Sequence, residues 1–169
     1  MDETFLIREA TPNDAAAIAR LHVDTFLETH GRGGPPHALR ERQWQEAFAR
    51  TGGNWFCFVI ARQSGELIGF AKGVPYTDDL PGFAGELNKI YLLREYHRRG
   101  VGRKLLGYIS RRFLEQGMTS MLLFGDAQNP TNGFYEAMGG ERLLTAKGEF
   151  HGGYGWRDLR LLAAKCPAK

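Results

Sequence analysis

A short basic segment with two glycines is the part of this chain best suited to binding an anion. In residues 87–105, LNKIYLLREYHRRGVGRKL, two glycines stand among arginines and lysines. Glycine lets backbone N–H groups approach a ligand closely, and the start of a helix offers unpaired N–H donors and a partial positive charge. These residues therefore predict a phosphate or pyrophosphate site at the beginning of a helix.

Common nucleotide-binding motifs do not fit these glycines. The GxxxxGK[ST] motif is absent, and the GxGxxG motif would require glycine where the chain has Leu105. A nucleic-acid backbone is disfavoured as the ligand, since no aromatic residues alternate with the basic ones to stack on bases. The residues alone leave the identity of the anion open.

The distribution of charge supports a local anion site. The whole chain has 22 Lys and Arg and 19 Asp and Glu, for a net charge of +3. Residues 94–112 hold seven basic residues and one glutamate, a balance of +6, which leaves −3 for the rest of the chain. A basic segment on an otherwise slightly acidic protein suggests a localised anion site, although a solvated helix face would have the same charge.

Other catalytic chemistries lack the residues that they require. Cys57 lies in the apolar run WFCFVI and is expected to be a buried, reduced thiol, and no pattern relates it to Cys166 or to a histidine. The five histidines form no HExxH motif and no Cys/His cluster, so no metal is expected. The GxSxG motif of serine nucleophiles is also absent.

The pattern of apolar residues predicts the elements that position the basic segment. Thr11, Pro12 and Asp14 form a helix start, and apolar residues at helical spacing predict an amphipathic helix directly after the glycines. Strands are expected at residues 5–8, 55–62, 67–74, 87–93, 120–124, 142–147 and 156–162, and helices at residues 11–28, 38–50, 101–113 and 131–138. The predicted fold is α/β, with a mixed, mostly antiparallel seven-stranded sheet flanked by about four helices and a parallel crossover around the basic helix.

Length and composition indicate an ordinary globular protein. The chain has 169 residues, 43% of them hydrophobic and 24% charged, and no apolar run reaches the roughly 20 residues that span a bilayer. The acidic N-terminus, MDET, lacks the apolar segment of a secretory signal. We expect one domain over residues 1–169, a cytoplasmic location and no association with a membrane.

Two motifs in the second half of the chain resemble signatures of the GNAT superfamily of acyl-CoA-dependent N-acetyltransferases. Residues 97–102, HRRGVG, are similar to the family's pyrophosphate loop, Q/R-x-x-G-x-G/A, although the first position, usually Gln or Arg, is His97 here. Residues 129–140, NPTNGFYEAMGG, resemble the second signature, and YGWRDL at residues 154–159 is similar to common endings. The first half of the chain agrees only in the order of its elements. A histidine in the loop would make phosphate affinity depend on pH.

The resemblance implies a single N-acetyltransferase domain with a site for acetyl-CoA. Backbone groups of Ile90, Tyr91 and Leu92 would pair with the pantetheine arm as with an added strand. The pyrophosphate would be held by backbone N–H groups and nearby charge from His97, Arg98, Arg99, Gly100, Val101, Gly102 and Arg103. Asn129 and Asn132 would contact the pantetheine or the nucleotide, although Gln128 is an alternative match for the usual asparagine.

The resemblance also implies an acid and a base. Tyr135 matches the tyrosine that in this family often protonates the departing CoA thiolate, and its alternative role is that of a packing aromatic. Glu86 stands where relatives often place the base that deprotonates the amine, and an ordinary strand-end glutamate is equally consistent with the sequence. Asp78 and Asp79 would either bind a cationic acceptor or simply form a solvated turn.

The implied activity is transfer of an acetyl group from acetyl-CoA to a primary amine by direct attack in a ternary complex. Residues 86–96, ELNKIYLLREY, are similar to polyamine-acetylating members, which favours a small cationic amine as the acceptor. Loops at residues 31–36 and 77–85 would border the acceptor pocket, and a homodimer is common among relatives. The alternative is a non-catalytic GNAT-fold module that binds CoA or another phosphate-bearing partner.

Overall fold

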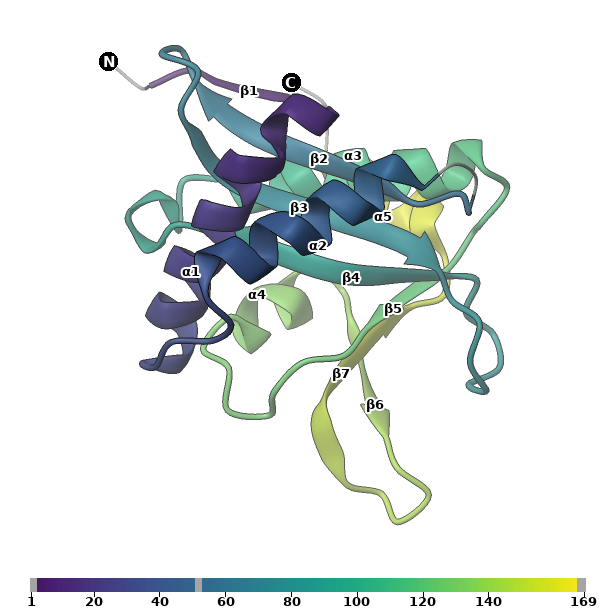
Figure 1. Ribbon diagram of the computed structural model, residues 1–169. Coiled ribbons are helices and arrows are strands. Elements are labelled where there is room, and N and C mark those ends of the chain that lie inside the picture. Colours follow the sequence, from purple (N-terminus) through teal and green to yellow (C-terminus); the bar gives the residue numbers. More distant parts are fainter. Residues whose placement is uncertain (1–2, 51–52, 167–169) are drawn as a thin grey trace.

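A seven-stranded sheet with helices on both faces forms the structure, a computed structural model that describes residues 3–50 and 53–166 (Figure 1). The strands are β1 (Phe5–Glu9), β2 (Phe56–Arg62), β3 (Leu67–Pro75), β4 (Gly85–Leu92), β5 (Met121–Leu123), β6 (Glu141–Leu144) and β7 (Phe150–Trp156). The helices are α1 (Ala15–His30), α2 (His37–Ala49), α3 (Val101–Glu115), α4 (Asn132–Ala137) and α5 (Leu159–Lys165). The strand order is β1-β2-β3-β4-β5-β7-β6, in which β4 and β5 are parallel and all other neighbours are antiparallel. This confirms the predicted mixed sheet and its parallel crossover through α3.

Local sequence signals explain where α1 begins and ends. The Thr11 N–H donates to Oδ2 of Asp14 at 2.8 Å, and Nη1 of Arg8 donates to the same oxygen at 2.8 Å. These bonds fix a 3-10 turn that leads into the helix, as the sequence predicts. The helix ends at Gly31, whose φ of +67° allows its N–H to bond the Leu27 carbonyl at 2.8 Å.

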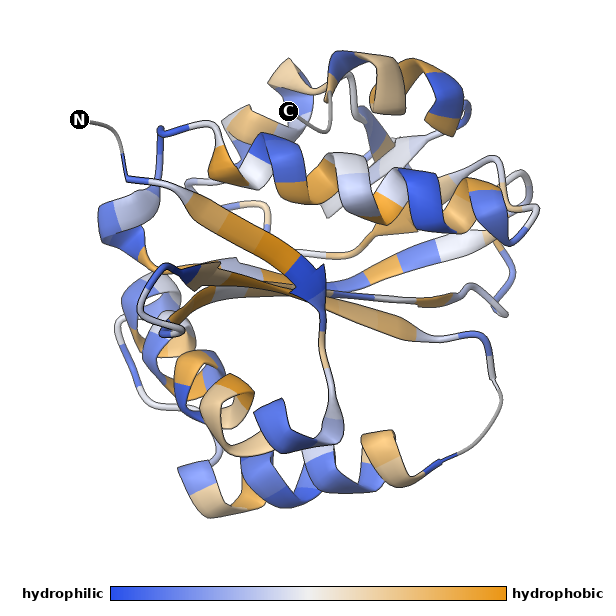
Figure 2. Cartoon of the chain, turned by 90° about the horizontal axis from the view of Figure 1, so that it is seen from above, coloured by the Kyte–Doolittle hydropathy of each residue, from blue (hydrophilic) through white to orange (hydrophobic). Residues whose placement is uncertain are grey.

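Alternate residues of β2 face two separate hydrophobic cores. The first core lies under α3 and includes Phe56, Phe58 and Ile60. The second core lies under α1 and α2 and includes Cys57 and Val59. Seen from above, helices lie on both sides of the sheet, whose strands carry many hydrophobic residues (Figure 2). Cys57 is a free, buried thiol, as predicted, and burial raises its pKa to about 12.

β4 and β5 are joined at one end only. Their parallel ladder contains two pairs, Gly85 with Met121 and Glu86 with Leu122. β5 ends at the next residue, Leu123, so the rest of β4 has no ladder partner on this side among the described residues. The sheet therefore opens beyond Glu86.

A bulge in β4 lies next to this opening. In the ladder between β3 and β4, Lys72 pairs with Lys89 and Gly73 pairs with Leu87, which leaves Asn88 as an extra residue on β4. A bulge bends its strand and increases the local twist. The bulge thus lies at the point where β4 and β5 separate.

The C-terminal region differs from the sequence prediction. The predicted strand at residues 156–162 is wrong, because β7 ends where that strand was expected to begin and α5 follows it. Asp158 caps this helix, with its Oδ1 accepting a bond from the Arg160 N–H at 3.0 Å. Leu159 and Leu162 are three residues apart and both buried, which is a helical period. The described residues therefore form five α-helices rather than about four.

Neither a membrane span nor a metal cluster is found in the part of the chain that the structure describes. No helix there is both long and apolar enough to cross a membrane. No group of three or more His, Cys, Asp or Glu side chains is arranged to hold a metal ion. Met1 and Asp2 of the acidic N-terminus lie outside the described residues.

Candidate active site

A cleft of about 200 Å³ occupies the opening between β4 and β5. β4 contributes the residues from Leu87 to Leu92, and the segment after β5 adds Phe124 to Asp126. Further lining residues come from the end of α1, from α4 and from the loops before α3 and α4: Thr29, His30, His97, Asn129, Thr131 and Tyr135. Ile90 packs on the core under α3 and Tyr91 on the core under α1 and α2, so residues from both faces of the sheet meet in this cleft.

The loop that precedes α3 has the backbone shape expected of an anion site. Arg98 and Gly100 have φ values of +65° and +78°, in the left-handed region. A Cβ on Gly100 would meet nothing within 4 Å, so glycine is required there for its backbone conformation and not for space. The first N–H groups of α3 follow directly, and helix geometry leaves them without intrahelical partners.

The arginines of this loop differ in the partners of their side chains. Arg98 and Arg99 are exposed, and the guanidinium of Arg99 lies 5.3 Å from the centre of the Tyr96 ring. Nε of Arg103 instead donates to the Lys165 carbonyl at 2.5 Å, at the end of α5. The side chains of Arg98 and Arg99 are therefore free to meet a phosphate, whereas that of Arg103 is already engaged.

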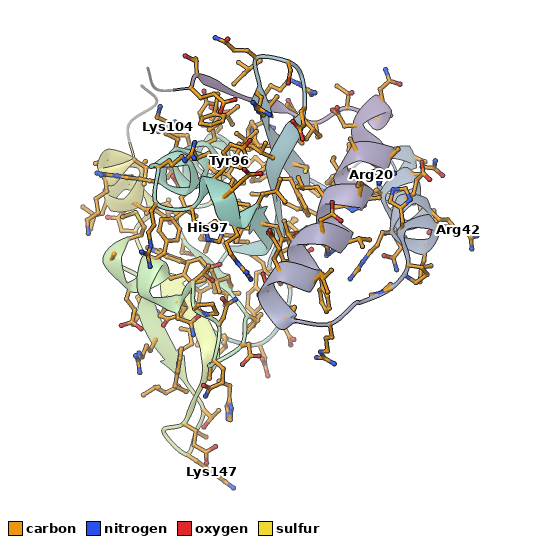
Figure 3. The ribbon with its side chains drawn as sticks, turned by 90° about the vertical axis from the view of Figure 1, so that its left-hand side faces the viewer. Arg20, Arg42, Tyr96, His97, Lys104 and Lys147 are labelled. Atoms are coloured by element: carbon orange, nitrogen blue, oxygen red, sulfur yellow. The ribbon has the colours of Figure 1, made fainter. Side chains whose placement is uncertain are left out.

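The side chain of His97 is directed back toward the cleft rather than outward along the loop. Its Nε2 donates to the carbonyl oxygen of Leu92 at 2.8 Å. In Figure 3, His97 lies between the end of α1 and α4. The imidazole thus covers the last carbonyl of the β4 segment that, by the family resemblance, would pair with the pantetheine arm.

Tyr135 of α4 is a buried residue whose side chain reaches the cleft. It is 7% exposed, and its ring centre lies 5.5 Å from that of Tyr154 and 6.3 Å from that of Trp156. The Tyr135 N–H donates to the Thr131 carbonyl at 3.4 Å, and the hydroxyl of Thr131 donates to Oδ1 of Asn129 at 2.6 Å. Burial raises the pKa of Tyr135 to about 12, so the phenol holds its proton near neutral pH.

The two asparagines of the second motif stabilise the loop between β5 and α4. Oδ1 of Asn129 accepts bonds from both the N–H and the hydroxyl of Thr131, and Asn129 lines the cleft. Nδ2 of Asn132 donates to the carbonyls of Asp126 and Ala127 at 3.0 and 3.2 Å. Oδ1 of Asn132 is buried without a partner among the described residues. Gln128 bonds this loop only through its backbone N–H.

Glu86 lies at the closed end of the opening and outside the lining of the cleft. Its Oε2 accepts a bond from Nδ2 of Asn88 at 3.2 Å, and Oδ1 of Asn88 accepts one from Nζ of Lys89 at 3.0 Å. Asp78 and Asp79 are exposed and lie outside the lining as well. Among the three predicted acidic residues, Glu86 is therefore the one with a hydrogen bond to a residue that lines the cleft.

The sequence reasoning missed a group of basic residues on the sheet face under α1 and α2. The pKa of the buried His22 is lowered to about 3 by its burial and by the charges of Arg40, Lys89 and Lys72. Nζ of Lys72 lies 5.5 Å from the ring of Trp44, and burial lowers the pKa of both lysines. The one sequence signal that could have revealed this group is Lys72, a charged residue inside the apolar run LIGFAKGVP.

Comparison with known proteins identifies the same fold and sequence family. The family model described as "Acetyltransferase (GNAT) family" matches residues 15–140. The uncharacterized N-acetyltransferase YuaI of Bacillus subtilis (strain 168) is 34% identical over 164 residues, which cover 92% of this chain and 95% of that protein. The PaiA N-acetyltransferase of Thermoplasma acidophilum, solved with coenzyme A, has a TM-score of 0.65 at 19% identity, covering 90% of this chain and 98% of that one. The aminoglycoside N-acetyltransferase AAC(6')-Iy, solved with CoA, has a TM-score of 0.69 at 19% identity, covering 86% and 95%.

Proposed function

The chain belongs to the acetyltransferase (GNAT) family, and on this premise we propose that it transfers the acetyl group of acetyl-CoA to a primary amine by direct attack in a ternary complex. The observation that carries the proposal is the cleft between β4 and β5, which His97 of the anion loop and Tyr135 both line. A long thioester substrate would have its phosphates at the start of α3 and its reacting carbon beside a buried acid.

Three features of the chain fit acetyl-CoA. The left-handed loop at Arg98 and Gly100 leaves backbone N–H groups and two exposed guanidinium groups for the pyrophosphate. The unpaired side of β4 offers backbone donors and acceptors to an extended, amide-containing arm. The buried Oδ1 of Asn132 has no partner among the described residues and would accept a bond from an N–H group. Binding of the arm along β4 would require His97 to release the Leu92 carbonyl.

The groups around the cleft suit attack by an amine on a thioester. Collapse of the tetrahedral intermediate releases a thiolate, and the phenol of Tyr135 would donate a proton as this charge develops. Thr131 and Asn129 line the cleft with this phenol and are joined to each other by a hydrogen bond of 2.6 Å. The attacking amine must first lose a proton, and Glu86 would accept it through water, because Glu86 itself does not line the cleft.

Thiol release from acetyl-CoA in the presence of a panel of amines tests this proposal. The panel contains polyamines, amino acids, aminoglycosides and lysine peptides, so that the small cationic amine favoured by the sequence is compared directly with other classes. We expect thiol release that depends on at least one amine and equals the N-acetylated product in amount. The Tyr135→Phe variant is the matched control, since it keeps the ring but lacks the acid.

A non-catalytic CoA-binding module is the second candidate. The loop before α3 would serve such a module equally well, because it requires only an anion site. The two candidates differ in outcome: a module would be stabilised by CoA against thermal unfolding yet release no thiol with any amine. Amine-independent thiol release would also contradict the proposed transfer.

A further inference from the structure

Three basic side chains, Arg40, Lys72 and Lys89, gather on the sheet face that α1 and α2 cover, and we call them the basic cluster. Lys72 of β3 and Lys89 of β4 are direct partners in the antiparallel ladder, a position in which like charges repel. Arg40 comes from α2, and all three cations act on the buried imidazole of His22. The fold thus holds three positive charges together on one half-buried surface.

Acidic side chains do not neutralise the basic cluster. Among residues 3–50 and 53–166, none of the ion pairs includes a member of the cluster. The ammonium of Lys72 lies 5.5 and 5.2 Å from the rings of Trp44 and Trp55, and that of Lys89 donates to the amide oxygen of Asn88. Both lysines thus have aromatic or amide groups as their nearest neighbours, and hydrogen bonds connect the carboxylate of Glu86 to Lys89 only through Asn88.

Two buried nitrogen atoms, one in the basic cluster and one on the histidine next to it, have no hydrogen-bond partner among the described residues. They are Nδ1 of His22 and Nε of Arg40. His22 is only 3% exposed, and its ring centre lies 5.3 Å from that of Tyr91, which lines the cleft. Buried polar atoms are normally paired, and Nε of Arg40 is always a donor, so its unpaired N–H next to concentrated positive charge points to an anionic ligand.

Lys89 is the member of the basic cluster that lines the cleft, and it lies on the side opposite to the proposed acid. Lys89 and Tyr91 line the cleft and face α1 and α2, whereas Tyr135 packs in the core under α3. A thioester that is bound beside Tyr135 leaves the α1 side for the acceptor. The acceptor would therefore approach past Lys89.

We propose that the acceptor amine also carries an anionic group, of the carboxylate type found in amino acids, and that the basic cluster binds this group. The inference rests on the proposed function and names the class of its second substrate. It differs from the small cationic amine that the sequence favours, because a polyamine would bring further positive charge to Arg40, Lys72 and Lys89. A carboxylate would instead supply the missing partner for these cations.

Pairs of substrates that differ only in a carboxylate test the inference. Each amino acid is compared with its decarboxylated amine: ornithine with putrescine, tyrosine with tyramine, and histidine with histamine. Thiol release is followed at saturating acetyl-CoA with the full chain. For the best pair, we expect kcat/KM of the acid to exceed that of the amine by about tenfold or more, since a site built for an anion rejects analogues that lack it.

Two lysine variants then connect this preference to the cluster. Lys72→Met and Lys89→Met keep an apolar stem and remove one charge. Each should lower kcat/KM for the acid by about tenfold, mainly through KM, and by several-fold more than it lowers kcat/KM for the amine. Lys147→Met is the matched control, because Lys147 lies at the tip of the β6–β7 hairpin, away from the cleft (Figure 3). Stabilisation by acetyl-CoA verifies that each variant is folded and binds its first substrate.

The outcomes separate this inference from the proposed function. Amines that react as fast as their matched acids overturn the inference and leave the N-acetyltransferase activity standing, and this comparison needs only the unmodified chain. Lysine variants that slow acid and amine equally also overturn it. If none of the amines tested supports thiol release, the proposed function is overturned and, with it, the inference.

Discussion

Replacing Tyr135 by phenylalanine removes one hydroxyl from the cleft and leaves the ring packing in place. Burial raises the pKa of this phenol to about 12. At pH 8 the ionised fraction is then about one part in 10,000, so the proposed acid is fully protonated throughout the usual assay range. A group that must donate a proton loses function only as the pH rises through its pKa. Tyr135 should therefore cause no alkaline decline of kcat below about pH 11.

The expected loss in the Tyr135→Phe variant is confined to the chemical step. From the usual contribution of a general acid, we expect kcat to fall by about 10- to 1000-fold. The lower values apply if water partly replaces the phenol as the proton donor. The Kd of acetyl-CoA should stay within a few-fold. Removal of the buried hydroxyl should change the free energy of unfolding by no more than about 1 kcal/mol, or roughly 2–4 °C in Tm.

The assay is single-turnover thiol release at several pH values, which verifies that chemistry limits the rate. Tyr154→Phe is the control, because Tyr154 is also a buried tyrosine whose hydroxyl donates to Oε2 of Glu136 at 2.5 Å and does not line the cleft. Unchanged turnover in Tyr135→Phe, or equal losses in both variants, would refute the assignment. An alkaline limb near pH 10 that disappears in Tyr135→Phe would refute the raised pKa.

Three further predictions concern the cofactor site and the second core. Acetyl-CoA at about 100 times its Kd should raise the free energy of unfolding by about 2.7 kcal/mol, or roughly 5–10 °C in Tm, and a melting curve that does not move contradicts the site. Gly100→Ala should weaken acetyl-CoA binding about tenfold in calorimetry, because an L-residue in the left-handed region costs about 1–2 kcal/mol. Arg99→Ala should weaken binding less and reduce its salt dependence, and equal effects of the two changes would indicate a merely electrostatic patch. The pKa of His22 is lowered to about 3, so the unfolded state binds the proton first. As the pH is lowered from about 6.5 to 3, the free energy of unfolding should fall by up to about 1.4 kcal/mol per pH unit because of this residue. Chemical denaturation of His22→Phe at several pH values should show a shallower dependence of the free energy of unfolding on pH.

Contiguous motifs made much of this arrangement predictable. The loop at residues 97–102 and the helix that follows it are specified by neighbouring residues, because glycine and the helix start act locally. The continuous apolar run of β2 is likewise typical of a strand with both faces buried. The C-terminal helix α5 was missed because seven residues are too few to display a helical period clearly, and the cap at Asp158 decides the outcome.

The acceptor side could not be predicted in the same way. Lys72 and Lys89 are far apart in the sequence and meet only through the register of β3 and β4. The extra residue Asn88 sets that register, and a single sequence does not reveal which position will bulge. The bond from His97 to Leu92 also depends on how the loop folds back on β4. Long-range pairing therefore limits what can be read from the residues alone.

The two cores of the sheet are completed at different times during synthesis. α1 and α2 precede β2 and β3 in the chain, so the face with Cys57 and Val59 can be covered as soon as these strands emerge. The face with Phe56, Phe58 and Ile60 must wait for α3, which begins 26 residues after β3 ends at Pro75. At about 5–20 residues per second, the nascent sheet presents an apolar surface for roughly one to five seconds. A ribosome that pauses between β3 and α3 would prolong this exposure and, with it, the time in which the nascent chain can aggregate.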